Sequence, residues 1–280
     1  MRILGMCALV LAVAAAPARA AVGDVHEIEL VRDSSFAVGA GSTGSSHDLD
    51  AIIERVIGQT EAGVELEYDL PREATKEERA DVWQFPARVL KRPDGSMQLL
   101  NEPELLLRVD KWLKAANWTR KICGHLIFTW NAFRIECDPQ SVIRNLQDFD
   151  LGGAPLHDGA LYRDPNALQS AALVRKSAAS GGATYSVELA VDPEKVREER
   201  VETDLAVAEI TGKKLERADA LLSHASEQIS GTITIDIETD PEGTAWRRTR
   251  VRKVEIKQAD GSTENRTTTE ILESRLVSTS

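Results

Sequence analysis

Apolar and polar residues alternate along several stretches of this chain, which is the pattern of strands that bury one face. In the clearest of them every second residue is isoleucine: Ile233, Ile235 and Ile237. Three such stretches close the sequence, at 232–238, 246–257 and 267–277. Only short turns rich in Asp, Gly and Pro separate them, and short connections join antiparallel neighbours. The C-terminal region therefore predicts a three-stranded meander.

Strand-like and helical stretches are mixed along the rest of the chain. Further strand patterns occur at 64–70, 82–90, 97–100, 125–137 and 184–191. Pro86 lacks the amide hydrogen that a central ladder needs, which puts its stretch at an edge or a bulge. Helical spacing or propensity occurs at 52–57, 102–116, 139–149, 167–176, 194–209 and 215–227. We therefore predict an α+β fold with two halves, each an antiparallel sheet packed by helices.

Runs rich in glycine, serine and proline divide the chain. The run 39–46 has the composition of a flexible loop, and it lacks the lysine that a phosphate-binding loop carries. A second run, 151–182, has the composition of a linker around a short helix. The predicted division is a signal peptide, 1–20; an N-terminal segment with the flexible loop, 21–62; a tryptophan-rich α+β domain, 63–150; the linker, 151–182; and an α+β domain, 183–280.

The first twenty residues have the three parts of a secretory signal peptide. Arg2 gives a positive start, an apolar run follows at 3–16, and 18–20 is an A-x-A cleavage signature. A membrane anchor is the alternative, but a span needs about 20 apolar residues, and Pro17 ends this run earlier. We expect an exported protein, periplasmic or secreted, with no transmembrane segment in the mature chain.

The charge balance narrows the classes of partner. The whole chain has 34 basic and 45 acidic residues, a net charge of -11. Cleavage after residue 20 removes two arginines, so 32 basic residues remain against 45 acidic ones and the net charge becomes -13. An acidic surface of this kind argues against a general nucleic-acid binder.

Export changes the chemistry expected of the cysteines. Only Cys123 and Cys137 remain after cleavage, and the compartment they enter is oxidising. We predict a disulfide between them, which requires the chain to reverse near Asn131. Zinc binding and redox catalysis are the alternatives, but two thiols alone make a poor zinc site and the spacing is not C-x-x-C.

No catalytic residues can be assigned from the sequence. His47 beside Asp48, and His157 beside Asp158, are candidate acid–base pairs. Residues adjacent in sequence often point in opposite directions, and we interpret both pairs as surface loops. The spacings typical of zinc enzymes and the G-x-S-x-G turn of serine hydrolases do not occur, so we expect neither a metal site nor a cofactor.

One local reversal of charge stands out in this acidic chain. Arg248, Arg250 and Arg252 fall on one side of a predicted strand, a spacing that could engage an anionic polymer or a lipid headgroup. The competing interpretation, which we favour, is cross-strand pairing with acids of the adjacent strands: Asp236, Glu238, Glu270 and Glu273.

These observations predict a non-catalytic binding or cell-envelope accessory protein. Its expected partner is an anionic envelope component or another envelope protein, and no nucleic acid is expected. The alternative is a hydrolase acting on an envelope component, with catalytic residues that converge only in the fold. A histidine within reach of both a carboxylate and a hydroxyl would favour the hydrolase.

Overall fold

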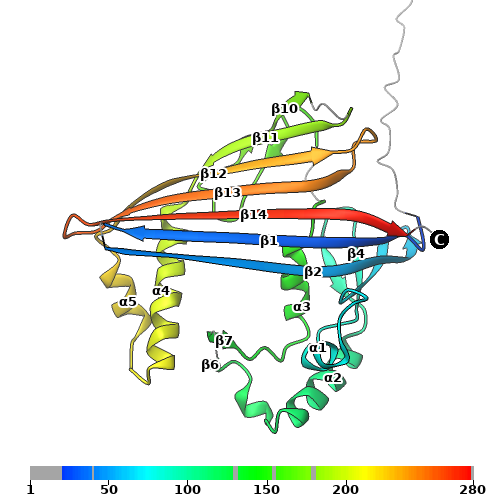
Figure 1. Cartoon of the computed structure of the whole chain (residues 1–280), viewed down its shortest axis with the longest axis horizontal. Helices are drawn as coiled ribbons and strands as arrows, with labels where there is room; N and C mark the ends of the chain where they lie inside the picture. Colours follow the sequence, from blue (N-terminus) through cyan, green and yellow to red (C-terminus); the bar gives the residue numbers. More distant parts are fainter. Residues whose placement is uncertain (1–20, 40, 129–131, 153–155, 178–180, 279–280) are drawn as a thin grey trace, which may run out of the picture.

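The chain forms one large antiparallel sheet with helices packed on it (Figure 1). This architecture comes from a computed structural model that describes residues 21–39, 41–128, 132–152, 156–177 and 181–278. The expected signal peptide, 1–20, lies outside the described residues. The α+β class predicted from the sequence is confirmed.

The ten strands of the sheet follow the order β10-β11-β12-β13-β14-β1-β2-β3-β4-β5. Their bounds along the chain are β1 Val25–Val38, β2 Ser42–Thr60, β3 Gly63–Asp69, β4 Ala87–Lys91, β5 Met97–Leu99, β10 Val174–Ser177, β11 Ala183–Ala190, β12 Gln228–Thr239, β13 Ala245–Lys257 and β14 Thr263–Ser278. Two short hairpins stand apart from it, β6 Leu126–Phe128 with β7 Ala132–Arg134 and β8 Leu161–Tyr162 with β9 Ala171–Ala172. The helices are α1 Lys76–Asp81, α2 Glu102–Ala115, the 3-10 turn η1 Arg120–Ile122, α3 Ser141–Asp148, α4 Pro193–Ile210 and α5 Arg217–Ser223.

Pairing between β1 and β14 joins the two halves of the chain into this one sheet. Leu30 lies opposite Leu272, and Arg32 lies opposite Glu270. The sequence predicted a separate sheet in each half, and the structure corrects that prediction. Strands β12, β13 and β14 are neighbours, but they belong to the larger sheet because β14 also pairs with the most N-terminal strand.

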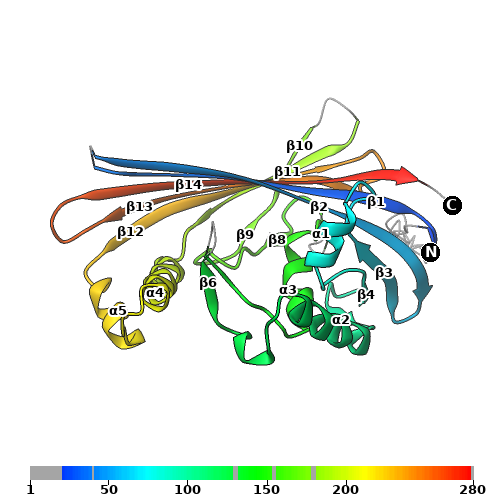
Figure 2. The ribbon, with the colours of Figure 1, turned by 60° about the horizontal axis from the view of Figure 1, so that its bottom comes forward.

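One face of the sheet is packed by α2, α3, α4 and α5 (Figure 2). The core on that face has two parts. The first lies beneath β1–β5 and includes Leu30 and Leu272 with Leu105 and Val109 of α2. The second lies beneath β11–β13 and includes the three alternating isoleucines of β12 with Val196 of α4. The alternation seen in the sequence thus sets which side of each strand the helices cover.

The glycine- and serine-rich stretch was predicted to be a flexible loop, and this prediction is wrong. Most of it lies in strands, because Ser42 begins β2 and the β1–β2 ladder extends to Val38 opposite Ser42. The predicted helix at 52–57 is also a strand, since Ile52 and Val56 of β2 are buried in the first core. Pairing with β1 along residues 42–55, and with β3 from Ile53 onward, outweighs the weak local preference of these residues.

The predicted linker contains sheet structure in place of a helix. Residues of the expected helix 167–176 form β9 and most of β10, and β10 pairs with β11 at one edge of the large sheet. By contrast, the predicted helix 102–116 is confirmed as α2, with Pro103 in its first turn. Where the apolar pattern is weak, pairing between strands decides the secondary structure, and the local composition does not.

Candidate functional site

A row of charged side chains crosses the helix-covered face between the two parts of the core. In the strand register, Arg32 of β1 lies opposite Glu270 of β14, which lies opposite Arg250 of β13. Directly opposite residues share a face of the sheet, so all three side chains point toward the helices. We call this set, with the acids that contact its two ends, the charged row: Asp50, Asp148, Arg32, Glu270, Arg250 and Asp164.

The inner end of the charged row is buried. Arg250 binds Asp164 with two hydrogen bonds, Nε to Oδ2 at 2.8 Å and Nη2 to Oδ1 at 3.2 Å. The Asp164 side chain is only 3% exposed and that of Arg250 only 12%. Burial alone would lower the pKa of Arg250, but hydrogen bonds and charge from Asp164 and Glu270 raise it above its ordinary value. This end of the row is a fully paired ionic contact that anchors the loop before β9 to the sheet.

The outer end of the charged row is exposed and carries more acids than it can pair. Arg32 donates from Nε to Glu270 Oε1 at 3.1 Å and from Nη2 to Asp148 Oδ2 at 3.2 Å. Its Nη1 lies 3.7 Å from Asp50 Oδ2. The side chains of Asp50 and Asp148 are 59% and 61% exposed. One guanidinium group therefore serves three carboxylates, two of them at the surface.

A cavity of about 500 Å³ lies beside this outer end. It is bounded by β1 and β2, the segment after α1, helices α2 and α3, and residues 133–136. Five aromatic side chains line it: Trp83, Phe85, Trp112, Phe133 and Phe149. Arg32, Asp50 and Asp148 line it too, so the exposed carboxylates stand where the cavity meets solvent. An apolar chamber with a few charged groups at its mouth is the usual form of a small-molecule site.

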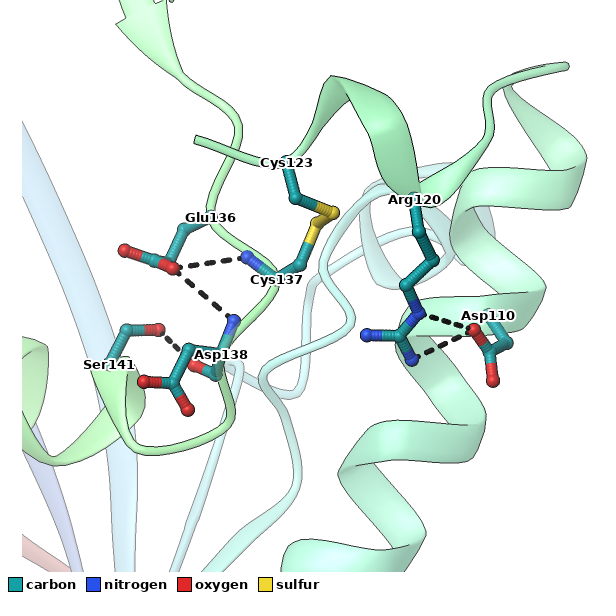
Figure 3. Close-up of a disulfide and its surroundings, with 7 residues drawn as sticks. All are labelled: Asp110, Arg120, Cys123, Glu136, Cys137, Asp138 and Ser141. Atoms are coloured by element: carbon teal, nitrogen blue, oxygen red, sulfur yellow. Dashed lines mark hydrogen bonds and ion pairs between the residues drawn. A yellow bond between two sulfur atoms is a disulfide. The ribbon is translucent and has the colours of Figure 1, made fainter. Parts of the chain in front are cut away.

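A disulfide holds the segment that forms one wall of the cavity (Figure 3). Cys123 and Cys137 are bonded with their Cα atoms 5.6 Å apart, which confirms the predicted pairing. Glu136 accepts hydrogen bonds from the backbone amides of Cys137 and Asp138, and Ser141 donates to the Asp138 carbonyl. The disulfide and these bonds fix the start of α3, which supplies Asp148 and Phe149 at its other end.

The arginine stripe of β13 faces the helices and is engaged by the protein itself. Arg248 donates to the backbone carbonyl oxygens of Asp150 and Asp148, and Arg252 donates to both carboxylate oxygens of Glu199 at 2.9 Å. The predicted partner Glu270 does contact Arg250.

The other three predicted partners do not contact the stripe. Asp236, Glu238 and Glu273 pair in register with odd-numbered residues of β13, so they lie on the opposite face. Glu238 and Glu273 contact Arg247 there.

The two histidine pairs proposed from the sequence do not form. His47 contacts Asp33 of the adjacent strand, Nδ1 to Oδ1 at 2.7 Å, while Asp48 points to the other face because strand residues alternate. The His47 side chain is 66% exposed on the sheet. His157 contacts the backbone oxygen of Asp158, whose carboxylate accepts from the amide of Arg175.

Sequence reasoning missed a histidine cluster at the other end of the molecule. His224 is 8% exposed and contacts Asp204 through Nε2 at 2.8 Å and Glu227 through Nδ1 at 2.9 Å. Arg200 joins Glu227 to Glu264. Glu227 follows His224 by three residues, just before β12, but Asp204 of α4 and Glu264 of β14 come from distant segments that no local spacing could have indicated. Both ring nitrogens contact carboxylates, so the arrangement is a structural ion network.

No group of three or more histidine, cysteine, aspartate or glutamate side chains in the described ranges could hold a metal ion. Within the same ranges, no helix is long and apolar enough to cross a membrane.

Comparisons with known proteins give no family. No family model matches the chain, and no curated protein matches it. Among solved structures, lipovitellin in a study of its lipid–protein interactions is 9% identical with a TM-score of 0.42, covering 92% of this chain. This chain spans about a quarter of that protein, 26%. A hot dog fold protein of unknown function from Alicyclobacillus acidocaldarius is 14% identical with a TM-score of 0.11, covering 94% of this chain and 82% of its own. Both scores are too low for either likeness to support a conclusion about fold or function.

Proposed function

We propose that this chain is an exported, non-catalytic binding protein that holds the apolar part of a cell-envelope component in the aromatic-lined cavity. The observation that carries the proposal is the cavity itself. Its volume of about 500 Å³ falls in the range of small-molecule sites, roughly 300–1,000 Å³. Phe85, Trp112 and Phe149 line the cavity and are only partly buried, so their rings offer flat apolar surfaces on which an acyl chain or a ring could pack.

The construction of the cavity supports a site that exists before the ligand arrives. Trp83 is only 3% exposed, and Ile135 and Val142 in the walls are 1% exposed, so these side chains are fixed by the core. The disulfide fixes the wall formed by residues 133–136. A preformed apolar site loses little conformational entropy on binding, which favours affinity.

The hydrolase alternative has no comparable support. Among the described residues, no histidine contacts both a carboxylate and a hydroxyl: His26 contacts Ser274, and His47 contacts Asp33. A nucleophile–base–acid arrangement needs all three groups within reach.

A neutral fluorescent probe tests the proposal. N-phenyl-1-naphthylamine is apolar and fluoresces strongly only out of water, so the mature protein should raise its emission in a saturable way. Asn145 is an exposed residue of α3 that lines the cavity, and Asn145→Trp should fill the mouth and abolish the signal. The matched control is Gln147→Trp, an exposed position of the same helix outside the lining, and it should bind the probe as the parent does. Equal binding by both variants would refute the cavity as the site.

A further inference from the structure

The charged row has an excess of negative charge, and the excess faces the cavity. The row contains four carboxylates and two guanidinium groups, which leaves a surplus of two negative charges. At the buried end Arg250 and Asp164 match each other, with side chains 12% and 3% exposed. The surplus therefore falls on Asp50 and Asp148, the two exposed members, and both line the cavity.

The rest of the cavity does not offset this excess. Its remaining charged lining residues are Asp81, Glu136 and Arg134. Arg134 lies 3.6 Å from Glu209 and also donates to the carbonyl of Gly124, so its charge is already engaged. Glu136 is paired with Arg144 at 3.2 Å. No guanidinium in the lining is left to receive an anion.

We propose that the ligand carries a positive charge: a cationic amphiphile with an amine or quaternary ammonium group at Asp50 and Asp148 and an apolar body among the aromatic rings. This inference rests on the proposed function and adds the chemical class of the ligand. A cation at the mouth contacts carboxylates, and aromatic ring faces also attract cations. The mouth suits such a group because the single positive charge of Arg32 faces three carboxylates.

This ligand class differs from the anionic component that the arginine stripe suggested. That suggestion required accessible guanidinium groups, but Arg250 binds Asp164, and Arg252 binds Glu199 through Nη1 while its Nε and Nη2 are buried. Arg248 is occupied by two backbone carbonyl oxygens. An anion would have to displace these internal partners of the arginines, whereas the carboxylates of Asp50 and Asp148 are exposed to a cation in solvent.

Competition against the bound naphthylamine probe tests the charge of the ligand. Three probes share one dodecyl chain and differ in the head group: dodecyltrimethylammonium, dodecanol and dodecyl sulfate, each below its micellar concentration. We expect the cationic probe to displace the dye at a concentration roughly tenfold lower than dodecyl sulfate, a ratio that corresponds to about 1.4 kcal/mol. Asp50→Asn with Asp148→Asn should remove most of that ratio and leave dodecanol unchanged. Asp110→Asn is the control, because Asp110 is also an exposed, arginine-paired acid, 58% exposed, but lies outside the lining.

The possible outcomes distinguish a failure of this inference from a failure of the proposed binding function on which it rests. If all three probes displace the dye equally, the cavity binds apolar chains and the inference about charge is overturned. If dodecyl sulfate binds most tightly, the inference is overturned in favour of an anionic ligand. If Asp110→Asn weakens the cationic probe as much as the paired variant does, the effect is the general acidity of the chain, and the inference again fails. Absence of dye binding by the parent protein would refute the proposed function itself.

Discussion

Replacing Arg250 by methionine should destabilise the protein strongly, because it leaves the buried carboxylate of Asp164 without its positively charged partner. Asp164 is 3% exposed, and its partners are Arg250 and the backbone amide of Asn166. Methionine fills similar space and removes only the charge and the hydrogen bonds. Breaking one side of a buried ion pair costs about 3–5 kcal/mol. A kilocalorie shifts the melting temperature of a domain this size by about 2–4 °C, so Arg250→Met should melt roughly 10 °C below the parent.

Removing both charges of the pair tests whether the unpaired charge causes the loss of stability. Arg250→Met combined with Asp164→Leu leaves no buried charge at this end of the row, and apolar replacement of a buried pair is often neutral. Urea unfolding should therefore show the double variant recovering most of the loss, as a double-mutant cycle for coupled residues requires. Arg275→Met is the matched control, because Arg275 is 56% exposed and pairs with Glu29 at the surface. It should change the free energy of unfolding by about 1 kcal/mol or less.

Two results would refute the reasoning about this pair. If Arg250→Met unfolds at the same urea concentration as the control, the pair is not a buried anchor. If the double variant is less stable than Arg250→Met, the loss comes from packing and not from an unpaired charge.

Three further predictions concern the disulfide and two titrating groups. Replacing Cys123 and Cys137 by serine should lower the free energy of unfolding by about 3 kcal/mol, because the disulfide restricts the entropy of the unfolded chain. Urea unfolding measures this loss, and an unchanged free energy of unfolding would contradict the prediction. Burial raises the pKa of Tyr68 well above its ordinary value, and the charge and hydrogen bond of Glu54 add to this. The parent should therefore lose stability as pH rises above about 10, where the unfolded tyrosine ionises, and Tyr68→Phe should lose less over that range. Burial would raise the pKa of Glu264, but hydrogen bonds from two arginines lower it. Its contribution is thus present above its ordinary pKa and lost as pH falls through the lowered value, so Glu264→Gln should flatten the acid side of a plot of unfolding free energy against pH.

The sequence predicted what depends on local chemistry. The pairing of Cys123 with Cys137 was predicted from the expected export and from loop closure, and α2 was predicted from an unbroken apolar stripe. The strands of the C-terminal region followed from strict alternation. In each case the residues that determine the element lie close together in the chain.

Contacts between distant segments could not be predicted. The β1–β2 hairpin was missed because glycine and serine have low strand propensity, and residues 42–46 are extended through their pairing with β1. The charged row was missed because Asp164 comes from the predicted linker and Asp148 from a helix end. The stripe containing Arg250 was found, but its main partner could not be, since that acid is 86 residues away.

The pairing of β1 with β14 has a consequence for how the protein reaches its folded form. Val25 lies opposite Ser278, so the middle of the sheet joins segments that are far apart in the sequence. Such long-range pairing is slow, since a large loop must close before it forms. Until β14 pairs with it, β1 presents an open ladder of unpaired amides and carbonyls along one edge, which invites association with other chains. Completion of the fold therefore depends on the arrival of the C-terminal strand, and a chaperone that shields β1 in the meantime would raise the yield of native protein.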